Sequence, residues 1–161
     1  MIAVLSDTHM PKGARALPEP ATRILGEAEA ALHAGDFFTV GILRETEALC
    51  PGPFHAVHGN VDEAELRGAL PETLEVEFDG ARIAMIHDAG PSHGRLSRMR
   101  ARFPRADAVI FGHSHMPLHE EADGFQIFNP GSPTERRRAP RHSMGTLRVE
   151  AGRPVFEHVW L

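Results

Sequence analysis

Short apolar runs alternate with segments of helical spacing along the first sixty residues of the chain. An apolar run bounded by polar residues is typical of a buried strand, and three such runs predict strands at 2–6, 31–34 and 54–57. Between them, the segments 20–30 and 40–49 have the apolar spacing of helices. The first follows two prolines, which suit a helix start, and the second stops at a Pro-Gly-Pro sequence.

The rest of the chain is dominated by strands. The runs 73–78 and 82–87 are joined through Asp79-Gly80, which predicts a β-hairpin. The pattern then predicts a helix at 94–103 and strands at 108–111, 125–128, 145–149 and 155–160. Helix-linked strands followed by hairpin strands indicate an α/β fold of two packed sheets flanked by helices. No repeat or linker divides the chain, so we expect one domain spanning 1–161.

Composition removes several classes of function. The apolar fraction of 42% and charged fraction of 24% are ordinary for a globular protein, and the net charge of -5 does not favour nucleic-acid binding. The single cysteine, Cys50, rules out an internal disulfide and a zinc site built from cysteines. The apolar start, Ile2–Leu5, is too short for a signal peptide or a membrane span, so we expect a cytoplasmic protein with no membrane partner. Eleven histidines are unusually many, and histidine is a common metal ligand.

Metal-ligand residue types gather where the predicted strands end. In open α/β sheets, ligands bind beyond the carboxyl ends of the strands, so these side chains are expected to converge on one point. The five clusters are Asp7-Thr8-His9, Gly35-Asp36, Gly59-Asn60-Val61-Asp62, His87-Asp88 and Gly112-His113-Ser114-His115.

These residue types suit a pair of divalent ions, which lie about 3.5–4 Å apart in dinuclear sites. Asp36 stands alone on a glycine turn and is our choice for a carboxylate that bridges both ions. Asp7 and His9 point the same way if the backbone between them is extended, and His113 and His115 have the same spacing. With two carboxylates and a hydroxide, such a pair keeps about one positive charge and attracts an anionic phosphate.

The ordered motifs DTH, GD, GNVD, a strand-ending His, GHSH and NPGS resemble the calcineurin-like metallophosphoesterases, and in particular their small single-domain bacterial and archaeal phosphodiesterases. The resemblance covers Met1 to about Ser132. It implies a four-layer α/β/β/α sandwich and hydrolysis of phosphate esters by a metal-bound hydroxide without a covalent intermediate. It also implies one ion held by Asp7, His9, Asp36 and His115, and a second held by Asp36, Asn60, His87 and His113. Asp36, Asn60, His87 and His113 would be the catalytic residues.

One position departs from the family. Many members have a histidine after the Asn of the GN motif, where it is thought to protonate the leaving group, but this chain has Val61. Loss of a general acid costs about 10²–10⁴ in rate for a poor leaving group, so we expect a preference for diesters or acidic leaving groups. Asp62 or His93 are candidates for a substitute acid. Asp88 either hydrogen-bonds to a ligand histidine or faces solvent.

Alternatives stay open at this point. The same fold also serves as a noncatalytic scaffold in some relatives, and a mononuclear metal site is a third hypothesis. We favour Mn²⁺, while Fe²⁺, Zn²⁺, Ni²⁺ and Co²⁺ also suit His, Asp and Asn ligands. The expected partner is a small phosphate-ester substrate, and homo-oligomer formation is left undecided. Outside the site, we expect the arginines of the 94–103 helix to face solvent and Trp160 to pack into the core.

Overall fold

The computed structural model describes residues 1–12 and 15–161, which form ten strands and four helices. The strands are β1 (Ile2–Leu5), β2 (Ala30–His33), β3 (Phe54–Ala56), β4 (Thr73–Phe78), β5 (Ala81–Ile86), β6 (Ala108–Ile110), β7 (Leu118–Ala122), β8 (Phe125–Asn129), β9 (Ser143–Glu150) and β10 (Arg153–Trp160). The helices are α1 (Glu19–Glu27), α2 (Val40–Ala48), α3 (Ala64–Ala69) and α4 (Arg95–Arg102).

Two five-stranded mixed sheets make up the centre of the molecule. The first, sheet A, has the strand order β10-β9-β1-β2-β3, and the second, sheet B, has the order β4-β5-β6-β8-β7. Neighbours β1, β2 and β3 run parallel in sheet A, and β5, β6 and β8 run parallel in sheet B. Parallel neighbours end at the same edge of their sheet, which is what brings the motif-bearing strand ends together.

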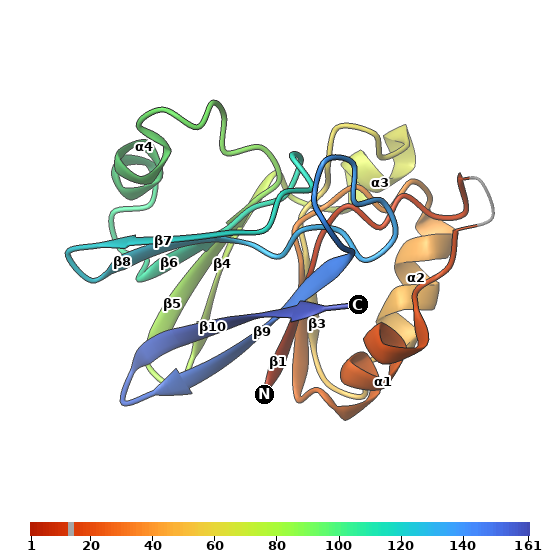
Figure 1. Ribbon diagram of the computed structural model, residues 1–161, viewed down its shortest axis with the longest axis horizontal. Coiled ribbons are helices and arrows are strands. Elements are labelled where there is room, and N and C mark those ends of the chain that lie inside the picture. The colour runs from red at the N-terminus through yellow and green to blue at the C-terminus, as the bar shows by residue number, and fades with distance from the viewer. Residues whose placement is uncertain (13–14) are drawn as a thin grey trace.

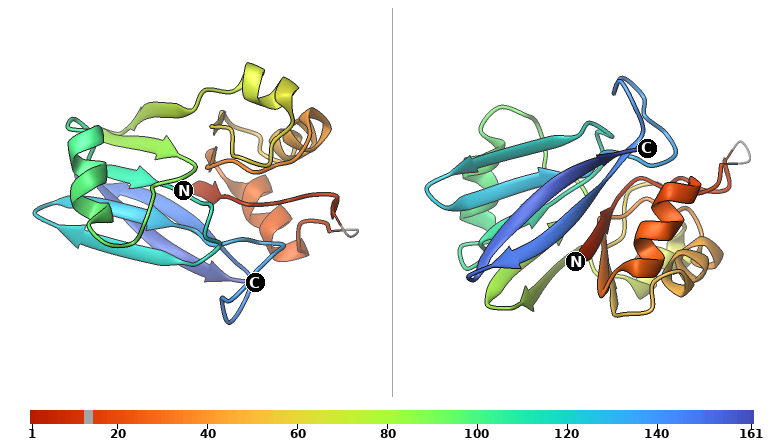
Figure 2. Two further views of the ribbon diagram at one scale, coloured as in Figure 1. Left: turned by 90° about the horizontal axis from the view of Figure 1, so that it is seen from above. Right: turned by 60° about the horizontal axis from the view of Figure 1, so that its bottom comes forward.

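The layers follow an α/β/β/α order. The sheets pack face to face over a core that includes Val4 and Leu32 from sheet A and Ile83 and Phe128 from sheet B. Helices α1 and α2 cover the outer face of sheet A, and α4 covers the outer face of sheet B (Figures 1 and 2). This arrangement confirms the predicted four-layer sandwich. Among the described residues, no helix is both long and apolar enough to cross a membrane.

Most predicted elements appear within a few residues of their expected bounds, with three differences. The helix expected at 20–30 ends at Glu27, and Ala30 already begins β2. Strand β7 was not predicted, because only Leu118 and Ala122 are apolar in it and it lies at the edge of sheet B with a largely exposed surface. The short helix α3 was also missed, since its six residues are too few to display a helical period.

Two expectations about side chains were wrong. Trp160 is 44% exposed, because β10 is an edge strand of sheet A. Arg100 and Arg102 of α4 are exposed as expected, but Arg95 and Arg98 are half-buried. Arg95 donates to the carbonyl of Gly90 and stacks on the ring of Phe111, and Arg98 donates to the carbonyls of Ala89 and Pro91. These two side chains therefore tie α4 to the loop that follows His87.

Candidate metal centre and active site

The polar clusters at five strand ends meet at one edge of the two sheets. Sheet A contributes Asp7 and His9 after β1, Asp36 after β2 and Asn60 after β3. Sheet B contributes His87 after β5, and His113 and His115 after β6. His9, His87 and His115 lie within ion-pair distance of Asp7 or Asp36. Asn60 contacts His87 and also His113, which connects His113 to the rest.

A first cluster consists of Asp7, His9 and His115, all of them buried. Nε2 of His115 lies 3.2 Å from Oδ1 of Asp7, and Nε2 of His9 lies 3.8 Å from the same oxygen. One ligand atom from each residue lies within 4.8 Å of the other two, which is compact enough for a single ion.

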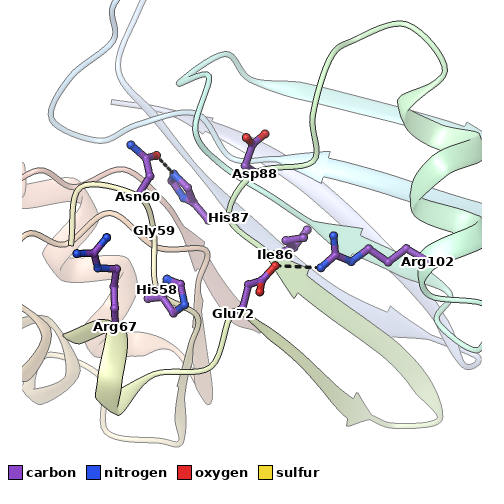
Figure 3. A pocket seen from close by; sticks show the side chains of 9 residues that line it. All are labelled: His58, Gly59, Asn60, Arg67, Glu72, Ile86, His87, Asp88 and Arg102. Carbon is purple, nitrogen blue, oxygen red and sulfur yellow. Dashed lines mark hydrogen bonds and ion pairs between the residues drawn. The ribbon is translucent and has the colours of Figure 1, made fainter. Parts of the chain in front are cut away.

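A second cluster forms around Asn60. Its Oδ1 lies 3.0 Å from Nε2 of His87 and 2.9 Å from Nδ1 of His113 (the Asn60–His87 contact is drawn in Figure 3). Nε2 of His87 also lies 3.2 Å from Oδ2 of Asp36. His87 and Asp36 are buried, whereas Asn60 and His113 are exposed and stand at the mouth of the site.

Asp36 lies between the two clusters. Its Oδ2 is 3.2 Å from Nε2 of His9 and 3.2 Å from Nε2 of His87. Its Oδ1 accepts a hydrogen bond from the backbone N–H of Val61, which fixes the orientation of the carboxylate. Asp7 also lies close to both sides, because Asp7, Asp36 and His87 offer ligand atoms within 4.8 Å of one another.

Three of the histidines are oriented so that Nε2 faces the centre. Nδ1 of His87 lies 2.8 Å from the carbonyl oxygen of Ala34, and Nδ1 of His115 contacts the carbonyl oxygen of Glu135. Nδ1 of His9 lies 3.3 Å from the carboxylate of Glu135. Oxygen partners place the proton on Nδ1 and leave the Nε2 lone pair for a cation, which is the usual role of outer partners at metal sites.

Glu135 was not identified from the sequence. It lies 126 residues from His9, in the loop between β8 and β9, and its carboxylate also pairs with Arg15 at 2.9 Å. Its only signal in the sequence is its place three residues after the NPGS motif. No spacing rule connects that position to the first cluster.

The donor set fits divalent cations. Nε2 of His9 and Nε2 of His115 are buried, and no described residue forms a hydrogen bond with either atom, although aspartate oxygens lie within 4 Å of both. Around His87, the atoms Nε2, Oδ1 of Asn60 and Oδ2 of Asp36 face each other, and all three are acceptors once Nδ1 carries the proton. A cation at each cluster would satisfy these atoms, and His nitrogens with carboxylate and amide oxygens suit Mn²⁺, Zn²⁺ and similar ions.

The pKa values of the metal-free site also indicate that the two carboxylates require positive charge beside them. Burial by itself raises the pKa of Asp36, but the imidazoles of His87 and His9 outweigh it and hold that pKa well below its usual range. Asp7 is buried too, and the neighbouring His115 and His9 likewise lower its pKa. Burial lowers the pKa of His9, yet the two carboxylates reverse this and raise it to about 9. Without metal, protons on the imidazoles therefore supply the positive charge that the carboxylates require.

The backbone at the site is not extended as the sequence argument assumed. Five of the expected ligands have positive φ: 55° at Asp7, 45° at His9, 65° at Asp36, 67° at His113 and 58° at His115. The i, i+2 pairs therefore converge through left-handed turns and not through the alternation of a strand, so the premise of an extended backbone was wrong. A left-handed conformation costs a non-glycine residue roughly 1–2 kcal/mol, and such strain is typical of functional sites.

Two glycines allow the strand ends to approach. A Cβ on Gly59 would lie 2.0 Å from Oδ1 of Asp36, and a Cβ on Gly112 would lie 2.6 Å from Oδ2 of Asp7. Any side chain at either position would push the loop off its carboxylate. The glycines of the GN and GH motifs are thus explained by close packing.

The other residues singled out from the sequence surround the site. Asp62 is 2% exposed and accepts hydrogen bonds from the backbone N–H groups of Asp36, Phe38 and Gly59, so its carboxylate joins the loops after β2 and β3. Asp88 is exposed and accepts from the N–H of Gly90. His93 is exposed in the loop before α4, where its carbonyl accepts from Arg98.

The NPGS segment is hydrogen-bonded to two of the loops that carry the expected ligands. Asn129 donates to the carbonyl of Gly112, and Ser132 donates to the carbonyl of Asp7. These bonds connect the loop after β8 to the loops after β6 and β1. The segment therefore helps to position the loops that carry Asp7 and His113.

Comparison with known proteins identifies the family of the chain. The family model of the calcineurin-like phosphoesterase superfamily domain matches residues 1–152. A probable metallophosphoesterase of Methanothermobacter thermautotrophicus is 34% identical over 139 residues, covering 85% of this chain and 79% of that protein. A protein of Methanocaldococcus jannaschii named as a phosphodiesterase is 26% identical, covering 81% of this chain and 82% of its own length.

A similar fold is found in Vacuolar Protein Sorting 29 of Cryptosporidium parvum, with a TM-score of 0.78 at 19% identity over 99% of this chain and 96% of that structure. At that identity the likeness concerns the fold alone. The family match, in contrast, extends over nearly the whole chain and includes all five strand-end motifs. The chain belongs to the calcineurin-like phosphoesterase superfamily.

Proposed function

We propose that this protein is a phosphoesterase that binds two divalent ions and prefers phosphodiesters. One observation carries the proposal: Oδ2 of Asp36 lies 3.2 Å from Nε2 of His9 and 3.2 Å from Nε2 of His87, one in each cluster. A single carboxylate placed between two sets of nitrogen ligands is what a bridged pair of ions requires. Asp7, His9 and His115 complete one set, and Asn60, His87 and His113 complete the other.

The protein side chains supply binding and orientation. Divalent ions, when bound, lower the pKa of water towards ~7 and stabilise negative charge on phosphate oxygens. Asp7 and Asp36 hold the ions, while the neutral ligands leave the pair with a small excess of positive charge that attracts an anionic ester. Asn60 and His113 are exposed at the mouth, so they are the ligands best placed to meet the substrate.

The preference for diesters rests on the environment of Val61. This residue follows Asn60 directly and offers only its backbone N–H, which is already bonded to Asp36. Asp62 is not available to a leaving group, because it is buried and its carboxylate accepts from three backbone N–H groups. An alkyl monoester needs a proton on its leaving group more than an aryl diester does. The name of the Methanocaldococcus relative, a phosphodiesterase, supports the same substrate class for this chain.

Hydrolysis of bis(4-nitrophenyl) phosphate with and without added Mn²⁺ tests the proposal. We expect turnover that depends on metal, about two ions per chain in active protein, and faster turnover of this diester than of an alkyl monoester. Asp36→Ala should remove both the activity and the bound pair. Glu65→Ala, on the exposed surface of α3, is the matched control and should retain both.

The alternatives make different predictions. A noncatalytic scaffold on this fold would show no turnover with any of Mn²⁺, Fe²⁺, Zn²⁺, Ni²⁺ or Co²⁺. A mononuclear hydrolase would be active with about one ion per chain. Full activity in the Asp36→Ala variant would mean that the centre lies elsewhere.

A further inference from the structure

A pocket of about 370 Å³ opens beside the second cluster. Asn60 and His87 line one end of it, and Arg67, Glu72 and Arg102 lie around the rest of its wall, with His58 and Ile86 between them (Figure 3). Small-molecule pockets commonly measure about 300–1,000 Å³. Because two proposed ligands form part of its wall, an ester bound at the ions has this pocket next to it.

The charged groups of the pocket are not equivalent. Arg102 is paired with Glu72 at 3.1 Å across the gap between α4 and the residue before β4. The carboxylate of Asp88 accepts from the N–H of Gly90 and points away from that ion pair (Figure 3). Arg67 is exposed on α3, and its guanidinium makes no hydrogen bond or ion pair with the residues at 1–12 and 15–161. Among the described residues of the pocket wall, Arg102 thus has an ion-pair partner and Arg67 has none.

We propose that this pocket binds the organic arm of the phosphodiester and that Arg67 recognises a second anionic group on that arm, such as a carboxylate or a phosphate. The inference rests on the proposed function, since the ions would hold the scissile phosphate. The flat ring of His58 and the apolar side chain of Ile86 give the arm a surface to lie on. A guanidinium presents two parallel N–H donors, which match a carboxylate or a phosphate in charge and shape.

Two diesters of nearly the same shape test this inference: bis(4-nitrophenyl) phosphate and bis(4-carboxyphenyl) phosphate. Nitro and carboxylate groups are both planar, and they differ in charge. Their leaving groups also differ, so the measured quantity is the ratio of variant to wild type for each substrate. Arg67→Ala should lower kcat/KM for the dicarboxylate about tenfold, mainly through KM, and leave the dinitro compound nearly unchanged.

A second variant should act in the opposite direction. Glu72→Gln removes the carboxylate that pairs with Arg102 and so adds a free cation to the pocket. We expect it to lower KM for the dicarboxylate severalfold with little effect on the dinitro compound. Arg44→Ala, on the exposed surface of α2 and outside the pocket, is the matched control and should change neither substrate.

Calorimetric titration of both diesters into the Mn²⁺-loaded protein separates this inference from the proposed function. Tighter binding of the dicarboxylate that is lost in Arg67→Ala, without turnover of either compound, would contradict the proposed function and support the pocket. Turnover of both diesters with equal effects of Arg67→Ala on each would overturn the pocket assignment and leave the proposed function intact. Equal affinities of wild type and Arg67→Ala for the dicarboxylate would also overturn it.

Discussion

At the scale of single residues, the site combines strained backbone with close contacts. His113 illustrates this, because it is exposed, has a φ of 67° and lies 2.9 Å from Asn60 through Nδ1. Its N–H donates to the carboxylate of Asp7 and its carbonyl accepts from Arg137, and these contacts hold a left-handed conformation that is unfavourable for any residue with a Cβ. We infer that a histidine at this position serves metal binding and lowers the free energy of unfolding.

Replacing His113 tests this strain. In metal-free protein, His113→Gly should be more stable to chemical denaturation than His113→Ala by about 1 kcal/mol, because glycine adopts positive φ without a steric cost. Both variants lose the same ligand, so the comparison isolates the backbone. Arg44 in α2 is the reference position, where glycine should be the less stable of the two. An alanine variant at position 113 as stable as the glycine variant would contradict the argument.

Val61 is the residue that separates this chain from relatives with a histidine there. Val61→His should restore a proton donor next to Asn60 and raise kcat for an alkyl phosphate ester by about 10-fold to 100-fold. The rate for an ester with an acidic leaving group should change little, because such a group departs without protonation. Val61→Gln, similar in size but unable to donate a proton as an acid, is the control. Equal gains for both kinds of leaving group would point to altered binding and not to acid catalysis.

At the scale of elements, loops distant in the sequence hold the ligands in place. The loop between β8 and β9 carries Glu135, whose carboxylate lies 3.3 Å from Nδ1 of His9 and 2.9 Å from a guanidinium nitrogen of Arg15. Ser132 in the same loop accepts from the N–H of Glu135 and donates to the carbonyl of Asp7. One loop therefore positions two ligands of the first cluster.

Glu135 should act as a positioning residue for His9. We expect Glu135→Ala to weaken binding of one ion about 10-fold to 100-fold, and Glu135→Gln to weaken it less, since the amide oxygen still accepts from Nδ1. Competition with a chelator and a metal count per chain would measure this. Glu65→Gln on α3 is the matched control. A purely structural role for Glu135 would lower the stability of metal-free protein while leaving the metal affinity unchanged.

At the scale of the whole molecule, the site joins the two sheets, and buried His33 lies beneath it. His33 is fully buried at the end of β2, where its Nδ1 accepts from the N–H of Gly35 and its ring stacks on Phe37. Burial lowers the pKa of His33 to about 3. An imidazole that remains neutral in the folded state but takes up a proton when unfolded makes stability depend on pH.

The direction of that dependence follows from the two pKa values. Below the ordinary pKa of about 6.5, His33 is protonated in the unfolded chain. In the folded chain it stays neutral until the pH falls to about 3. The contribution of His33 to the free energy of unfolding should therefore fall by about 1.4 kcal/mol per pH unit as pH decreases through this window. Denaturation of metal-free protein between pH 6 and 4.5 would measure the slope. His33→Asn, which keeps an acceptor for Gly35 and does not titrate, should be less sensitive to pH, and an unchanged slope would contradict the assignment.

The sequence alone determined the residue types and the order of the site. Apolar runs ending in Asp, Asn or His predicted both the strands and the points where ligands would gather, because strand burial and metal binding each leave a local pattern. The sandwich fold and the family followed from the same motifs. The ligand assignments for both ions remain predictions that the metal counts will test.

Only the tertiary structure decided how those residues meet. The left-handed turns at Asp7 and His113, the carboxylate of Glu135 beside His9, and the place of Arg67 in the pocket wall all depend on contacts between distant segments. A side chain becomes a positioning group or a recognition group through its neighbours in space, and those neighbours lie on different strands and loops. A local sequence pattern does not specify distances between residues that are far apart in the chain. These contacts could therefore not be predicted from the sequence.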